Sequence, residues 1–198
     1  MLAPRVGRLI AIEPLASLRR ILRLTSPSAL VAGGVAERLP LRASAVVGVV
    51  AAQAFHWFDG PAALAECHRV LRDGGALILV WNVRDNDVSW VGAISELIEP
   101  LRGDTPTYRD GAWRAHLRAH EGFGPVSERT FPYEQPMTVD ELVDRHLSIS
   151  FVASQPADVR AEVEREIRRI AADDPATRHR ASFAFPYRTL VASARRAS

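Results

Sequence analysis

The sequence contains no lysine, so all 25 of its basic residues are arginine. Arginine keeps its charge at high pH, which explains how a pI of about 9.2 coexists with a formal net charge of only +2 at pH 7. The basic residues are interleaved with 23 acidic ones, whereas a nucleic-acid-binding surface gathers its cations on one face. We therefore expect no nucleic-acid partner.

The chain is also poor in cysteine and in long apolar runs. Its single cysteine, Cys67, cannot form an internal disulfide, and this favours a cytoplasmic location. No apolar run reaches the roughly 18 residues of a membrane span, and the first 30 residues lack the uninterrupted apolar stretch of a signal peptide. We expect no membrane partner, and no pattern indicates an oligomeric state.

The first half of the chain alternates between apolar runs and segments with helical spacing. The run "AVVGVVAA" is apolar on both faces, as is typical of a central parallel strand covered on each side. In "GPAALAECHRVLRDGG", a proline fits the first turn of a helix and the double glycine predicts its left-handed end. The strands are expected at Leu9–Ile12, Ala29–Ala32, Ala45–Ala52 and Ala76–Asn82, and the helices at Leu15–Leu24 and within Gly60–Gly75.

The second half differs in pattern. Two segments alternate as strands do, Pro125–Gln135 and Ser182–Ala194, and could add an antiparallel edge to the sheet. Helices are predicted at Trp90–Leu101, Val139–Ser148 and Ala157–Ala172. The whole pattern predicts an α/β, Rossmann-like fold with a mostly parallel sheet. We expect one domain over residues 1–198, and the change of pattern divides it into about 8–82 and about 83–198.

Glu13 ends the first predicted strand, and an acid in that place commonly holds the ribose of a nucleotide cofactor. The glycine-rich loop that completes such a site belongs roughly 20 residues earlier. Only seven residues precede Arg8, and Gly7 is the one glycine among them. A strand–helix–strand unit needs roughly 30 residues, so we expect the first strand and its glycine loop to be missing, as in an N-terminally truncated chain.

Four stretches in order resemble the class I S-adenosylmethionine-dependent methyltransferases, in particular the type 11/12-like domain. They are "LIAIEP", "GGVAERLPL", "AAQAFHWFD" and "ALAECHRVLRDGGALILVWN". Two residues depart from the family pattern: Asp73 replaces a proline, and Val35 stands where many members have an acid that contacts adenine. The resemblance also implies that the missing strand lies at the centre of the sheet, between the strands that end at Ile12 and Ala52.

The resemblance implies an incomplete methyltransferase domain over residues 1–198, with the cofactor-binding part in about 8–82 and the substrate-side helices and C-terminal strands in about 83–198. It implies S-adenosyl-L-methionine as cofactor and assigns roles to several strand-end residues. Glu13 would bind the ribose, although it could equally be a helix N-terminal charge favoured by the dipole. Glu37 would lie at the adenine edge, or is merely a polar loop residue. The full set of expected cofactor-binding residues is Glu13, Pro14, Leu15, Ala36, Glu37, Gln53 and Ala54.

No catalytic residue can be assigned from the sequence. His56 has a side chain suited to proton transfer at neutral pH, but in "FHWF" a packed or substrate-lining imidazole is the stronger interpretation. Trp81 and Asn82 could face an acceptor pocket, or Asn82 could lie in a turn. The histidines show no convincing metal-ligand spacing, and we expect no metal.

The sequence thus favours methyl transfer to an unidentified small molecule, with doubtful activity for these 198 residues because the cofactor loop is missing. The alternative is an inactive remnant or a non-enzymatic interaction module of methyltransferase descent. A nicotinamide oxidoreductase shares the strand-end acid but not the combination of "AERLPL" and "AAQAFHWF".

Overall fold

A computed structural model describes residues 7–197 and has the expected α/β character. The chain separates into two compact units. The described residues of unit 1 are 7–80, 107–128 and 192–197, and those of unit 2 are 81–106 and 129–191. The expected single domain, divided near residue 82, stays a prediction.

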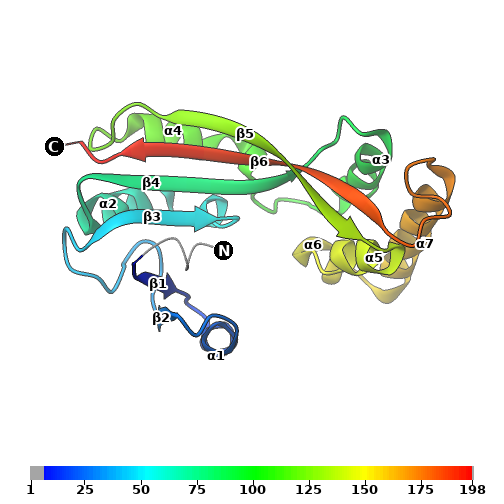
Figure 1. Cartoon of the computed structure of the whole chain (residues 1–198), viewed down its shortest axis with the longest axis horizontal. Helices are drawn as coiled ribbons and strands as arrows, with labels where there is room; N and C mark the ends of the chain where they lie inside the picture. The colour runs from blue at the N-terminus through cyan, green and yellow to red at the C-terminus, as the bar shows by residue number, and fades with distance from the viewer. Residues whose placement is uncertain (1–6, 198) are drawn as a thin grey trace. The chain divides into compact units, whose positions relative to one another are not determined.

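Unit 1 opens with strand β1 (Leu9–Ile12), helix α1 (Ala16–Thr25) and strand β2 (Ala29–Ala32). β1 and β2 pair in parallel and form a two-stranded sheet of their own. Strand β3 (Val46–Ala52) belongs to a second sheet, of order β3-β4-β6-β5, and pairs in parallel with β4 (Leu71–Arg84). In the described residues, no strand joins β1 to β3 (Figure 1).

The core of unit 1 lies between the sheet and two helices, α2 (Gly60–Val70) and α4 (Ala112–Ala119), which contact each other. Two short 3-10 helices, η2 (Phe55–Trp57) and η4 (Tyr108–Asp110), also belong to this unit. Asp59 caps α2 by accepting a hydrogen bond from the backbone nitrogen of Ala62 at 3.2 Å, and Pro61 occupies the first turn as predicted. The side chains that fill this core are Phe55, Leu64, Cys67, Val70, Leu71, Leu77, Leu79, Trp113, Leu117 and Phe123.

None of residues 7–54 is in the buried class, and each of them is partly or fully exposed. Three of the large apolar side chains of α1 are exposed, Leu18, Ile21 and Leu24, and Leu24 reaches 78%. On β3, Val47 is 71% exposed and Val50 is 43% exposed. The expectation that β3 is a central strand covered on both sides is therefore wrong for these residues: β3 is an edge strand, because no described strand pairs with its second edge.

A second expectation also fails, at the end of α2. The helix ends at Val70, and Leu71 is already extended (φ −69°, ψ 142°). Gly74 has a φ of +69°, but it lies inside β4, where the register with β3 is irregular between Val46 and Gly48. The left-handed backbone of Gly74 therefore lies in an irregular part of the strand and does not end the helix.

The strands β4, β5 (Ser127–Met137) and β6 (Phe183–Arg195) contribute residues to both units. The helices of unit 2 share its core with β5, through Met137, and with β6, through Phe183 and Phe185. β6 runs opposite to β4 and β5 and supplies the expected antiparallel part of the sheet (Figure 1). The helical elements of unit 2 are α3 (Ser89–Ile98), η3 (Glu99–Leu101), α5 (Val139–Leu147), α6 (Ser150–Ala153) and α7 (Ala157–Asp173).

The core of unit 2 is aromatic and aliphatic. Trp90 packs edge-on against Phe183 and Phe185, with ring centroids 5.5 and 5.3 Å apart. Ile94 and Ile167 bring α3 and α7 into the same cluster. Among residues 7–197, no helix is long and apolar enough to cross a membrane.

Candidate functional site

Glu13 follows the last residue of β1, at the carboxyl end of a parallel strand, where ligands of open α/β sheets bind. Its backbone nitrogen donates to Ala32 O at 3.2 Å, so the residue extends the pairing with β2 by one position. Its carboxylate Oε1 accepts a hydrogen bond from the backbone nitrogen of Leu15, the N-cap residue of α1, at 2.8 Å. This contact matches the interpretation of Glu13 as a charge at a helix N-terminus, and a carboxylate has further lone pairs with which to accept ribose hydroxyls.

The residues next to Glu13 are held in place by one arginine. Arg19 Nη1 donates to the carbonyl oxygens of Glu13 and Pro14, at 2.9 and 2.6 Å. Leu15 is exposed. An exposed leucine directly after the acid is available to cover one face of a planar group.

Gln53 occupies the corresponding place after β3. Its backbone nitrogen donates to Val80 O at 2.8 Å, and its φ is +54°. A left-handed conformation is uncommon for a residue with a side chain, and such backbone clusters at functional sites. Ala54 follows as the N-cap of η2. The chain thus turns sharply at this strand end.

The loop that contains Ala36 and Glu37 is tied to α2. Glu37 Oε1 accepts a hydrogen bond from the backbone nitrogen of Asp59 at 3.0 Å, just before the helix. Further along the loop, Glu66 of α2 accepts from Leu39 N at 2.9 Å, and Arg69 donates to Leu41 O at 2.8 Å. Glu37 is therefore more than a solvated loop residue, because its carboxylate fixes the loop against the start of α2.

His56 lies in η2, half-buried, with its ring 5.4 Å from that of Trp57. Burial lowers its pKa, while the Asp110 carboxylate acts in the opposite direction. A lowered pKa keeps the imidazole neutral at pH 7, as a proton acceptor needs to be. The structure is compatible with both interpretations of His56, the packed ring and the base.

Trp81 and Asn82 belong to unit 2 and point to opposite faces of β4. Trp81 is fully buried and so is a core residue. Asn82 is exposed and lies inside the strand, and its Oδ1 accepts a hydrogen bond from Thr189 Oγ1 at 2.9 Å. The alternative that Asn82 lies in a turn is wrong, because β4 continues to Arg84.

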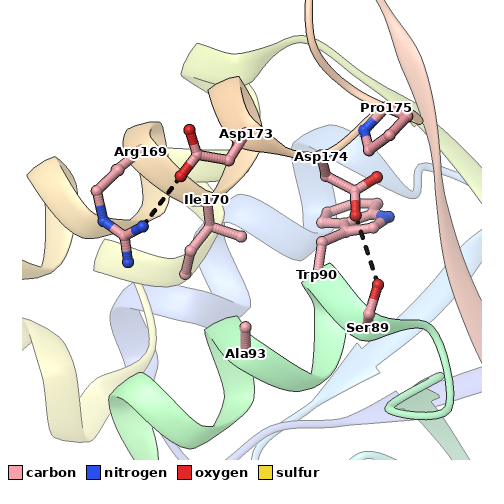
Figure 2. Close-up of a pocket in the computed structure, with 8 residues that line it drawn as sticks. All are labelled: Ser89, Trp90, Ala93, Arg169, Ile170, Asp173, Asp174 and Pro175. Atoms are coloured by element: carbon pink, nitrogen blue, oxygen red, sulfur yellow. Dashed lines mark hydrogen bonds and ion pairs between the residues drawn. The ribbon is translucent and has the colours of Figure 1, made fainter.

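Unit 2 also contains a pocket of about 320 Å³ between α3 and the end of α7 (Figure 2). Its polar groups interact with one another: Arg169 pairs with Asp173 at 3.0 Å, and Ser89 donates to Asp174 at 3.4 Å. None of the expected cofactor residues lines it. In the described part of the chain, no group of three or more metal-ligating side chains is placed to hold a metal ion.

Comparison with known proteins identifies the family. A model described as "Methyltransferase domain" matches residues 1–79. An uncharacterized methyltransferase-like protein of Schizosaccharomyces pombe is 32% identical over 98% of this chain and 75% of its own length. The chain is a class I S-adenosylmethionine-dependent methyltransferase family member.

Further comparisons agree with this family membership. An uncharacterized methyltransferase of Mycobacterium tuberculosis H37Rv is 33% identical to the chain, over 93% of the chain and 73% of its own length. A solved structure of a type II methyltransferase from Anaeromyxobacter dehalogenans superposes with a TM-score of 0.61 at 22% identity, over 99% of this chain and 82% of that one. A methyltransferase structure from Bacillus halodurans gives 0.59 at 19% identity, over 100% and 86%. These two structures support the fold.

The cofactor of this methyltransferase family member is S-adenosylmethionine. The residues at the strand ends of unit 1 have side chains and backbone of the types that this cofactor requires. The Glu13 carboxylate and the left-handed turn at Gln53 lie at the carboxyl ends of two parallel strands of unit 1. A carboxylate can accept the hydrogen bonds that ribose hydroxyls donate.

Proposed function

We propose that this methyltransferase family member transfers the methyl group of S-adenosylmethionine to a small-molecule acceptor. One observation supports this most directly: Glu13 and Gln53 each follow a parallel strand at its carboxyl end, within the same unit. The cofactor supplies a methyl group already activated by a positively charged sulfur. The protein then has to bind, orient and, where needed, remove a proton.

The proposal gives each strand-end residue a role. Glu13 accepts the ribose hydroxyls, Pro14 and Leu15 cover one adenine face, and Ala36 and Glu37 lie at the adenine edge. Gln53 and Ala54 flank the methionine part of the cofactor. His56 is the candidate proton acceptor, and no other described residue is proposed for that role.

We further propose that residues 1–198 alone bind the cofactor weakly. In the described residues, β1 and β3 are in separate sheets and each has an edge without a partner strand. Neighbouring strands lie about 4.8 Å apart, so a strand inserted between two others occupies a slot of roughly 10 Å. The loop that follows such a strand would contact the amino-acid part of the cofactor, and no described segment supplies it.

The exposed edges favour a second candidate function, an inactive remnant or a non-enzymatic interaction module of methyltransferase descent. Free strand edges and exposed apolar residues such as Val47 and Leu24 are the features through which a sheet pairs with another chain. In that case the strand-end residues would keep their positions without binding a cofactor.

Binding of S-adenosylhomocysteine separates these proposals. Heteronuclear NMR titration of residues 1–198 should give a dissociation constant above about 1 mM, with shifts centred on Glu13 and Gln53. Glu13→Gln should weaken binding by roughly tenfold, since it removes a charged acceptor. The matched control Glu96→Gln changes an exposed carboxylate on α3 and should leave binding unchanged.

Three other outcomes would count against parts of the proposal. A tight one-to-one calorimetric titration would contradict weak binding by these residues. Equal affinities of Glu13→Gln and Glu96→Gln would contradict the ribose role. A folded chain that shows no shifts at millimolar ligand would favour the interaction module.

A further inference from the structure

Two histidines of unit 1 that have no role in the cofactor proposal lie against each other. His68 of α2 and His120, which follows α4, have ring centroids 5.6 Å apart. Both rings contact the buried Phe123, with centroids 5.8 and 5.1 Å from that of the phenylalanine. A Cβ on Gly122 would lie 2.5 Å from Cδ2 of His68 and 3.0 Å from Cε1 of His120. The two imidazoles therefore pack directly over the backbone of Gly122, and only glycine leaves room for them.

The same backbone pairs with the end of β6. Ala197 N donates a hydrogen bond to Gly122 O at 2.9 Å, and Gly124 N donates to Arg195 O at 2.8 Å. We call the four residues joined by these two hydrogen bonds the C-terminal junction. Because hydrogen bonds at the end of a strand can open locally at a lower free energy than global unfolding requires, the junction can respond to a change in its neighbours while the rest of unit 1 stays folded.

The contact between His120 and the junction requires a neutral imidazole. Gly122 N donates a hydrogen bond to His120 Nδ1 at 3.1 Å. A ring nitrogen accepts a hydrogen bond only while it carries no proton, and both nitrogens of an imidazolium are donors. Protonation of His120 at Nδ1 therefore removes an acceptor from the residue that holds Ala197.

An arginine next to the junction opposes a further positive charge there. The side chain of Arg196 is only 18% exposed, and its Nη1 donates to Leu71 O and, at 3.2 Å, to Ser44 Oγ. Its Nη2 lies 3.4 Å from the exposed carboxylate of Asp73. In the described chain, the buried Nε of Arg196 has no hydrogen-bond partner. A positively charged imidazole beside this guanidinium is therefore disfavoured by like-charge repulsion.

The groups around His68 have a net effect in the same direction. Burial lowers the pKa of this imidazole, Arg196 and His120 lower it further, and Asp73 raises it. The folded chain thus binds a proton at His68 less readily than the unfolded chain does, so this contribution to stability is complete above about pH 6.5 and declines as the pH falls. Other charged side chains close in sequence either pair with each other, as Glu66 and Arg69 do, or are exposed: Arg72, Arg118, Glu121 and Arg195.

We propose that His68 and His120 form a pH-sensitive latch, which holds the C-terminal junction closed while both imidazoles are neutral and opens it when they are protonated. Histidine changes its charge between about pH 8 and 5, so mild acid is the signal. Opening breaks the two hydrogen bonds of the junction and frees the end of β6, whereas the core of unit 1 stays packed. The latch does not depend on cofactor binding or on methyl transfer.

Amide hydrogen exchange of the full chain tests the latch. The readout is the protection factor of Ala197 N–H divided by that of Ala63 N–H, which donates to Asp59 O in α2 at 2.8 Å, so that acid effects on the whole unit cancel. Between about pH 7.5 and 5 this ratio should fall roughly tenfold, the effect of a shift of one pKa unit. His120→Asn keeps an oxygen acceptor near the Nδ1 position but cannot be protonated, and should abolish most of the fall. His68→Gln should reduce it.

The matched control is His116→Asn, which removes an imidazole of α4 that packs against Gly60 and should keep the wild-type fall. Circular dichroism confirms that each variant is folded. A constant ratio in the wild type would overturn the proposal, and so would an equal fall in His120→Asn and His116→Asn. If His120→Asn does not fold, the wild type decides by NMR: the amide shift of Ala197 should titrate with the imidazole protons of His68 or His120, and a shift independent of pH would refute the latch.

Discussion

The carboxylate of Glu37 lies 3.0 Å from the backbone nitrogen of Asp59 and accepts its hydrogen bond. This contact joins two stretches that lie 22 residues apart, the loop after β2 and the start of α2. Glu37, the residue expected at the adenine edge, is therefore held in position by its contact with the N-cap residue of α2. This relationship gives the first of four predictions.

Glu37→Gln should lower the free energy of unfolding by about 1 kcal/mol, because a neutral amide accepts the Asp59 hydrogen bond less strongly than a carboxylate does. Urea denaturation followed by circular dichroism measures this change. Glu96→Gln is the control and should have no effect beyond experimental error. Equal stability of the two variants would show that the Glu37 contact is not formed in solution.

The uneven burial of unit 1 predicts a large contrast between two leucine truncations. Leu64 of α2 is fully buried, and Leu64→Ala should cost about 2–5 kcal/mol. Leu24 of α1 is 78% exposed, and Leu24→Ala should change stability by less than about 0.5 kcal/mol. The two variants remove the same atoms from helices of the same unit, so each is the control for the other. Similar losses in denaturant unfolding would contradict the exposure of α1.

The single cysteine should be inert in the folded chain. Cys67 is buried in α2, and burial, with a smaller contribution from Glu66, raises the pKa of its thiol to about 12. Since the thiolate is the reactive form, a disulfide reagent at pH 8 should react at least about 100-fold more slowly with the native chain than with the unfolded chain. The double variant Cys67→Ser/Ala65→Cys moves the thiol to an exposed position of the same helix and should react rapidly while folded. A fast native reaction of Cys67 would show that α2 is not packed as described.

Acid should destabilise unit 2 through His146. Burial lowers the pKa of this imidazole to about 4, its hydrogen bond to Leu142 O opposes the shift, and Arg84 and Arg145 reinforce it. Between about pH 6.5 and 4 the unfolded chain binds a proton that the folded chain does not, so stability is complete above pH 6.5 and declines as pH falls toward 4. The loss amounts to about 3 kcal/mol.

Denaturant unfolding of wild type and His146→Leu across this pH range measures that contribution. The variant should show a clearly smaller loss of stability on acidification, since it lacks the titrating group. His179→Asn removes an exposed histidine and should keep the wild-type slope. A slope unchanged in His146→Leu would contradict the burial of His146.

Local patterns in the sequence predicted most of the elements correctly. Apolar runs with turns at their ends predicted the strands near β1, β2 and β3, and helical spacing predicted α1, α3, α5 and α7 within a few residues. Glu13 follows the end of β1 and Gln53 follows the end of β3, as the strand-end pattern indicated. These features depend on residues a few positions apart in the chain, and such short-range relationships can be read directly from the sequence.

Other features depended on segments far apart in the sequence. The end of α2 shifted from the double glycine to Val70 because residues after it pair with β3, and α4 was not predicted at all. The apolar and aromatic residues of α4 are few, and the helix is recognisable only in the structure, where Trp113 and Leu117 are buried in the core of unit 1.

The sequence by itself determined the fold class, the family resemblance and the strand-end candidates, since all of these follow from residue order and local spacing. Only the tertiary structure decided that residues 7–54 bury no side chain, and that Arg145 meets Tyr187 across 42 positions. The physical reason is that burial and charge pairing depend on distances in space, and chain order does not fix these until strands and helices have packed.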